Sequence, residues 1–355
     1  MTRLLEILIS IAIVFALYLV VALVLPSHRH LVEKVETNRK LTIVFDSLNS
    51  LRRFKDWNPL VLRDPRVQLT LSGPDSGVGA RLDYSSTEER IGDGSWEITE
   101  SVPREKVTYK IENIERGGDK TTSFLFKPTG RNNRNVEITQ TYDVDYGWDL
   151  LGRYAGLYVS RHVGDDMKLG LSRIVSMLAA VPNVDYAVAG SKMTAPKVVQ
   201  RPAEDLLFVS AGNVERGNAQ IQASMTANSE WIKRVMDANG LEPVGPMRII
   251  TTDLGRETYT FDVAQAVRKK DGGAIGTPTL QGPVKFVHTE PMKVAMASYT
   301  GYMAELDNVR NALRAWASTS GYEITDRAYE SYKSGIAGAF TENGEFDVYW
   351  PLKAK

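Results

Sequence analysis

The chain opens with one long apolar run. The stretch from Leu4 to Leu25 contains a single residue that is charged at neutral pH, Glu6, close to its start. An α-helix rises about 1.5 Å per residue, so these 22 residues reach roughly 33 Å, enough to cross the roughly 30 Å hydrocarbon core of a bilayer. The pattern predicts a transmembrane helix over residues 4–25, with the lipid bilayer as its partner.

A secretory signal peptide is the alternative interpretation, because Arg3 supplies a minimal positive segment before the apolar run. The run exceeds the about 7 to 15 apolar residues of an ordinary signal peptide, and Pro26 to His30 offer no cleavage site of small residues. We therefore favour an uncleaved, single-pass anchor in a bacterial inner (cytoplasmic) membrane.

The charges beside this run leave the side of the membrane open. Arg29, Lys34, Arg39 and Lys40 follow the helix, whereas Arg3 precedes it. A literal count of positive residues places the soluble part in the cytoplasm. Short anchors with a small basic head often insert the other way, so both orientations stand.

The next part of the chain alternates apolar and polar residues in short segments. We expect a strand over residues 31–36 and a helix over residues 41–53. Turn-forming segments rich in Gly, Pro, Asp or Asn then separate strand-like pieces, at a spacing of about 10 to 14 residues. This spacing is typical of one antiparallel meander. The predicted strands cover residues 67–71, 79–85, 95–100, 106–112, 121–127 and 135–142.

The periodicity becomes helical over residues 163–181. Met167, Leu171 and Ile174 recur on one face of this predicted helix, which Pro182 ends. A curved sheet wrapped around one long helix leaves an apolar cavity of the kind that holds small molecules. We expect these three side chains to line part of that cavity.

A turn with a tryptophan follows the first predicted helix. The residues Asp56-Trp57-Asn58-Pro59 break the helix, since a residue that precedes proline avoids helical geometry. Such a turn needs an anchor to fix its direction, so Trp57 is predicted to be buried.

The same region resembles a known superfamily. The quoted motifs are Phe54–Leu60 (FKDWNPL), Asp64-Pro65, Leu71–Arg81 (LSGPDSGVGAR) and Gly92–Glu100 (GDGSWEITE). In type and order they look like the SRPBCC (START-like, polyketide-cyclase-like) superfamily, particularly its bacterial membrane-anchored members, over about residues 31–180. The resemblance implies a helix-grip fold that binds a hydrophobic ligand between its sheet and its C-terminal helix.

Two segments of the C-terminal half can be laid over each other. Each reads as strand, helix, strand, strand, over about residues 202–268 and 284–355. Two such copies imply a pseudo-twofold domain whose sheet carries both helices on one face. The predicted α+β chain therefore contains an anchor and flank (1–30), a START-like domain (31–182), a linker (183–201) and a second domain (202–355).

The second copy resembles the GyrI-like domain, the effector-binding domain of AraC- and MerR-type regulators. The resemblance rests on Tyr299 to Tyr302, Leu306, Leu313, Trp316, Gly321-Tyr322, Tyr329 to Tyr332 and the ending Glu345 to Leu352. It implies a cleft between the two copies, lined by aromatic residues and holding one buried acidic residue that attracts amphipathic or cationic compounds. By its position in the motif, Glu330 is that residue.

The residue types support this chemistry independently. A carboxylate among aromatic rings attracts an organic cation through its charge and through the ring faces. In the alternative interpretation the rings are simply core and Glu330 faces water on an edge strand. The candidate ligand-binding residues here are Glu330, Tyr302, Trp316, Tyr329, Tyr332 and Trp350, with Tyr349 close by.

Composition excludes several kinds of site. Lys and Arg total 43, as do Asp and Glu, so no global basic field exists to attract nucleic acid. The chain has no cysteine and four histidines, so we predict no disulfide, no metal site and no cofactor. His28 and His30 are expected to be a polar juxtamembrane flank rather than metal ligands. No helix-turn-helix precedes the GyrI-like region, which argues against DNA control.

Three functions remain open at this stage. The first is a membrane-tethered, non-enzymatic binding protein for hydrophobic or amphipathic small molecules, acting in sensing, sequestration or transfer. The second is a hydrolase or cyclase that acts on a small hydrophobic substrate with Glu330 as acid or base. No nucleophile elbow, phosphate-binding loop or metal-spaced histidine pair supports it. The third is a scaffold whose cavities are filled by its own side chains. The sequence indicates no particular protein partner.

Overall fold

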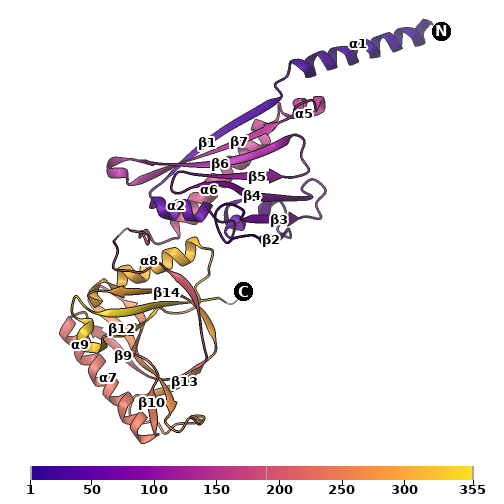
Figure 1. The fold of residues 1–355 in the computed structure, drawn as a ribbon. Helices are drawn as coiled ribbons and strands as arrows, with labels where there is room; N and C mark the ends of the chain where they lie inside the picture. The colour runs from indigo at the N-terminus through magenta and orange to yellow at the C-terminus, as the bar shows by residue number, and fades with distance from the viewer. Residues whose placement is uncertain (1, 189, 354–355) are drawn as a thin grey trace. The chain divides into compact units, whose positions relative to one another are not determined.

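The computed structural model describes residues 2–188 and 190–353 and divides into two compact units, residues 1–183 and 184–355. Figure 1 shows the helices and strands of both units. Both are built around a curled antiparallel sheet with helices, so the chain is α+β.

The first unit begins with α1 (Thr2–Val24). An 18-residue window within Arg3–Val24 has a mean hydropathy of 3.1, and this helix is long and apolar enough to cross a membrane. Nearly all of its described side chains are exposed, as expected for a helix that is apolar on every face and has little protein around it.

A seven-stranded antiparallel sheet forms the body of the first unit, in the order β1-β7-β6-β5-β4-β3-β2. Strands β2 to β7 are neighbours in chain order, which confirms the predicted meander, and β1 joins at the β7 edge. The strands are β1 (His28–Thr37), β2 (Gln68–Ser72), β3 (Arg81–Ser85), β4 (Asp93–Val102), β5 (Lys106–Glu112), β6 (Gly118–Thr129) and β7 (Asn135–Asp145).

Apart from α1 and α6, the helices of this unit are short. Predicted from residue 163, α6 begins four residues earlier, and it buries Met167, Leu171 and Ile174 as its apolar face requires. The bounds are α2 (Leu41–Leu48), α3 (Phe54–Trp57), α4 (Leu60–Arg63), η1 (Arg131–Asn133), α5 (Leu150–Ala155) and α6 (Val159–Ala179).

Trp57 is 2% exposed, which confirms its predicted burial. Its ring meets those of Phe54, Trp96 and Phe124 edge to face, with centroids 5.4 to 6.0 Å apart. Such pairs stabilise beyond the area they bury, typically by about 0.5 to 1.5 kcal/mol each. The turn after α3 is thereby fixed against the sheet.

The second unit has a nine-stranded antiparallel sheet. Its order is β13-β9-β12-β11-β15-β16-β14-β8, and β10 also pairs with β12. The strands are β8 (Lys197–Arg201), β9 (Glu204–Glu215), β10 (Leu241–Pro243), β11 (Arg248–Leu254), β12 (Thr258–Lys269), β13 (Lys285–Thr289), β14 (Met292–Thr300), β15 (Tyr329–Tyr332) and β16 (Glu345–Leu352).

One apolar core joins this sheet to its two long helices. Ile221 and Met225 of α7, and Leu306 and Leu313 of α8, share a single buried cluster with sheet residues such as Val263. The helices are α7 (Asn218–Ala238), η2 (Met303–Glu305), α8 (Leu306–Thr319) and α9 (Gly335–Ala339).

The predicted linker over residues 183–201 is partly structured. Its last five residues form β8, which pairs with β14 from Met292↔Arg201 to Met296↔Lys197. The apolar pair Val198-Val199 inside a polar segment was the sequence signal for this edge strand. Its partner strand, β14, lies about 95 residues later in the chain.

Candidate functional site

A cavity of about 130 Å³ opens in the first unit. It lies between α6, the turn after α3 and the inner side of the sheet, where the predicted fold would hold a ligand. The wall includes Trp57, Asn58, Pro59, Leu60, Arg63, Tyr84, Arg90, Ile91, Trp96, Ile111, Asn113, Ile114, Glu115, Thr122, Gln140, Tyr142, Val163, Asp166, Met167 and Gly170.

Two residues of this wall, Trp57 and Gln140, each carry a buried side-chain atom with no hydrogen-bond partner among the described residues: Nε1 and Oε1. The orientation of the Gln140 amide is fixed by its neighbours. The Thr122 hydroxyl donates to the carbonyl of Thr141 at 2.7 Å, so its oxygen is left to accept from Gln140 Nε2 at 3.2 Å. Oε1 is therefore the free end of the amide. A buried polar atom left unpaired costs about 1 to 3 kcal/mol, which a complementary ligand recovers.

The depth of the cavity is uncharged, while its surroundings carry charge. Burial raises the pKa of Tyr84 to about 12 and also raises that of Tyr142, so both phenols stay neutral. Burial raises the pKa of Asp166 as well, against the opposing effect of Arg63, whose Nη2 lies 2.7 Å from its Oδ1. The arrangement suits an apolar ring inside and a polar group outside.

The three predicted cavity residues on α6 separate in the structure. Met167 lines the cavity, Leu171 lies on a shallow groove beside Lys34, and Ile174 is completely buried in the core. Side chains across the buried face of a helix point in different directions, so only those at one edge of the face reach the cavity. Gly170 also lines the cavity, and a Cβ added there would meet Pro59 Cδ at 3.6 Å, an ordinary van der Waals contact.

The polar part of this wall was not predicted from the sequence. Thr122 and Gln140 stand at inward positions of β6 and β7, in line with buried apolar residues such as Phe124 and Ile138. A polar residue at such a position was the available signal.

Glu330, the predicted ligand carboxylate, lies inside the second unit. Its side chain is 0% exposed, and β15 is flanked by β11 and β16, so the alternative of an exposed edge strand is wrong. Arg310 of α8 pairs with it at 2.6 Å, from Nε to Oε1. Burial raises the pKa of the Glu330 carboxyl, and Arg310 partly offsets this. The counter-ion of this carboxylate is therefore a residue of the protein.

The predicted aromatic set does not gather around Glu330. Successive residues of a strand point to opposite faces, so Tyr329 lies on the other side of the sheet, stacked on Tyr349 with centroids 4.8 Å apart. Tyr332 shares the side of Glu330 and is buried, whereas Tyr302 is 49% exposed in the segment after β14.

Of the two predicted tryptophans, Trp316 belongs to α8 and Trp350 packs against that helix. Trp350 donates from Nε1 to the backbone carbonyl of Arg310 at 3.0 Å. Trp316 stacks on Tyr322, with centroids 6.0 Å apart. Both rings therefore have protein partners.

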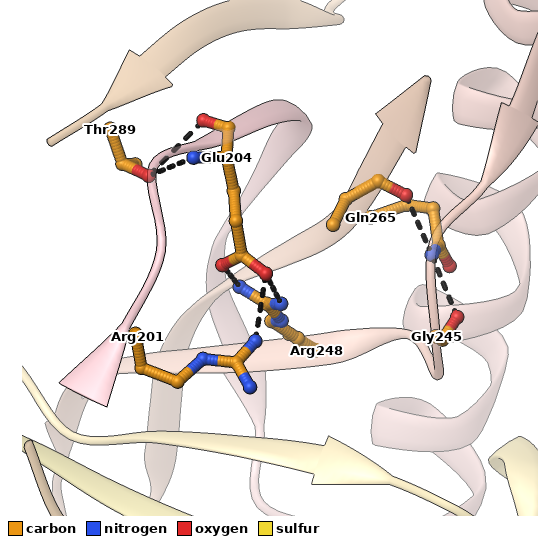
Figure 2. Close-up of polar contacts among 7 residues, drawn as sticks. Arg201, Glu204, Gly245, Arg248, Gln265 and Thr289 are labelled. Carbon is orange, nitrogen blue, oxygen red and sulfur yellow. Dashed lines mark hydrogen bonds and ion pairs between the residues drawn. The ribbon is translucent and has the colours of Figure 1, made fainter. Parts of the chain in front are cut away.

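A second charged cluster lies at the junction of β8 and β9 (Figure 2). Glu204 accepts hydrogen bonds from Arg201 and, through both oxygens, from Arg248, all at 2.7 Å. The Thr289 hydroxyl meets the backbone N–H and C=O of Glu204 at 3.1 Å each. The cluster ties β8, β9, β11 and β13 together, which is a structural role.

Burial alone would raise the pKa of Glu204, but its bonds to Arg248 and Arg201 outweigh burial and lower it. The carboxylate is thus charged in the folded chain. The two guanidinium groups also lie over rings, Arg248 over Tyr329 at 5.6 Å and Arg201 over Tyr349 at 5.5 Å.

No protein-family model and no curated protein sequence matches this chain. The solved structures similar to it include the EcmrR C-terminal domain, at 16% identity over 45% of this chain and 98% of that one, with a TM-score of 0.38. EcmrR in complex with DNA matches at 15% identity over 64% and 89%, with a TM-score of 0.39. A hydrolase from Listeria innocua matches at 14% identity over 44% and 91%, with a TM-score of 0.33. No functional conclusion follows from likenesses at these scores.

Proposed function

We propose that this chain is a membrane-tethered, non-enzymatic protein that binds a small hydrophobic or amphipathic molecule in the cavity of its first unit. The observation that carries the proposal is the cavity, whose wall includes two residues with an unpartnered buried atom, Nε1 of Trp57 and Oε1 of Gln140. One is a donor and the other an acceptor, so the ligand carries both kinds of group.

The size of the cavity limits what enters it. A cavity of about 150 Å³ lined by apolar residues holds a benzene molecule, and this one measures about 130 Å³. The buried part of the ligand is therefore about the size of one ring. Trp57, Trp96 and Met167 supply flat or soft apolar contacts to it. The rest of the molecule remains outside, beside Arg63 and Asp166.

Membrane attachment is supported by α1. Its apolar circumference and its exposure are those of a helix surrounded by lipid. We propose that it is a single-pass anchor in a bacterial inner membrane. The proposal holds for either orientation, with the soluble units on the cytoplasmic side or on the opposite side. A catalytic role of Glu330 is not part of the proposal, because its carboxylate is buried against Arg310.

The test uses the full chain in detergent and two ring-sized probes, phenol and toluene. Ligand-detected NMR is expected to show phenol binding more tightly, because only phenol offers a donor and an acceptor. In Gln140→Leu the preference for phenol is expected to fall several-fold, whereas the exposed control Gln68→Leu keeps it. Equal binding of both probes to the wild type, or no binding of either, would overturn the proposal.

Native mass spectrometry of the same preparations identifies any molecule that is carried through purification. An added mass on the wild type that is lost in Gln140→Leu and kept in Gln68→Leu would identify the natural ligand.

A further inference from the structure

The end of α1 is attached to the first unit by side chains of α5. Tyr154 stacks on Tyr18, with centroids 4.6 Å apart and an interplanar angle of 11°. Its hydroxyl also donates to the backbone carbonyl of Tyr18 at 2.9 Å. Ala22, one turn further along α1, is fully buried. The last two turns of α1 therefore lie against α5, which Figure 1 shows beside the junction of α1 and β1.

Arg153 covers the C-terminal end of α1. The last carbonyls of a helix lack partners within the helix and attract positive charge. Nη1 of Arg153 lies 3.2 to 3.4 Å from the carbonyl oxygens of Ala22, Leu23 and Leu25. Its Nε and Nη2 donate to the carbonyl of Gly147 at 2.9 and 2.6 Å. One guanidinium thus joins the helix end to the chain that enters α5.

Large apolar side chains around α5 point away from the protein. The residues 147–158, which we call the α5 segment, expose Trp148 by 83%, Leu151 by 55%, Leu157 by 50% and Tyr158 by 61%. Four such side chains in twelve residues are a costly surface in water. Trp and Tyr are, however, the residues enriched where a membrane meets water.

The position along α1 connects these observations. Tyr18 precedes Leu25 by seven residues, or about 10 Å of helix. If α1 spans the bilayer, the α5 segment beside these turns lies at the level of the membrane surface. The apolar surface of α1 then continues directly into that of the α5 segment.

We propose that the α5 segment is a membrane-interface element, with Trp148, Leu151, Leu157 and Tyr158 inserted into the same bilayer that α1 crosses. The inference rests on the membrane anchor of the proposed function. Arg153 fits this place, because its charged group is hydrogen-bonded to backbone carbonyls and lies over the ring of Trp148, 5.9 Å from its centroid.

The same element links the bilayer to the cavity. Asp149 caps α5 by accepting from the N–H of Gly152 at 2.9 Å, and it also pairs with Arg116 at 3.1 Å. Arg116 follows directly on Asn113 to Glu115, which line the cavity. Insertion of the α5 segment therefore holds this part of the cavity wall near the lipid, where a hydrophobic ligand is concentrated.

The absence of cysteine makes the test direct. Single-cysteine variants of the full chain, Leu151→Cys and Leu157→Cys, are labelled with an environment-sensitive fluorophore and reconstituted in phosphatidylcholine–phosphatidylglycerol vesicles. Quenching by spin-labelled lipid is compared with quenching by aqueous iodide. Phe15→Cys reports on the anchor. Leu125→Cys is the matched exposed control. Gly118 pairs with Asp145, at the end of the sheet where β7 leads into α5. Leu125 lies seven residues further along β6, about 23 Å from that end.

The expected result is lipid quenching at positions 151 and 157 several-fold above that at position 125, with iodide quenching correspondingly low. Iodide quenching at 151 and 157 equal to that at 125, with position 15 quenched by lipid, would overturn the inference and leave the anchor standing. Protection from both quenchers at 151 and 157 would overturn it in favour of a protein neighbour. Iodide access at position 15 would instead remove the anchor itself, and the inference with it.

Discussion

The Nε atom of Arg310 lies 2.6 Å from Oε1 of Glu330, and the two side chains are 7% and 0% exposed. The carboxylate thus meets a guanidinium from α8 within the core of the second unit. Arg310 also donates to the Tyr259 hydroxyl at 3.4 Å. Removing one partner of a buried pair leaves the other charged and unpaired, which costs far more than the pair itself contributes.

Glu330→Gln is therefore expected to destabilise the second unit, by about 3 to 5 kcal/mol. Urea unfolding of the full chain, followed by tryptophan fluorescence, measures this loss. The exposed control Glu342→Gln should unfold like the wild type. The double variant Arg310→Met/Glu330→Leu removes both charges and should recover much of the loss. Unchanged stability of Glu330→Gln would show that the pair does not hold this core together.

Gln140→Leu is expected to stabilise the first unit. The Gln140 Oε1 atom is buried without a partner among the described residues, so its loss removes an uncompensated desolvation cost of about 1 to 3 kcal/mol. The lost bond to Thr122 offsets part of this gain, so the net increase should be about 1 kcal/mol. A thermal scan monitored by circular dichroism tests it. A large drop in melting temperature would mean that the amide is a structural group rather than a ligand contact.

Two helical glycines of α6 offer a matched pair of variants. Gly170 and Gly164 both lie inside α6 with room for a Cβ, so replacement of either by alanine should stabilise the helix by about 0.5 to 1 kcal/mol. Only Gly170 lines the cavity. Gly170→Ala should therefore weaken binding of phenol, whereas Gly164→Ala should leave it unchanged. NMR titration of the two variants decides this, and equal effects would place the probe elsewhere.

The Glu204 cluster predicts a pH dependence of stability. The folded-state pKa of Glu204 lies below its ordinary value of 4.5, so its contribution is complete above about pH 4.5 and is lost as the pH falls through the lower folded value. Urea unfolding between pH 7 and pH 3 should show this loss. Glu204→Gln cannot titrate and should be less stable at pH 7, with a smaller decrease towards low pH. Parallel curves for the two proteins would contradict the prediction.

Local patterns in the sequence determined much of the first unit. The apolar run gives a helix long enough to span a membrane, and the turn chemistry gives the strand order β2 to β7, because both depend on neighbouring residues alone. Trp57 was predicted to be buried for the same reason, since the Asn-Pro turn beside it constrains the local chain direction.

Pairings between distant residues were decided only by the tertiary structure. The sequence marks Glu330 as unusual, but the identity of its partner, Arg310, depends on how α8 crosses β15. The unpartnered atoms of Trp57 and Gln140 come from segments more than 80 residues apart, and whether each finds a protein partner depends on the packing around it. A sequence shows which groups need partners, whereas three-dimensional packing determines which of them are left for a ligand.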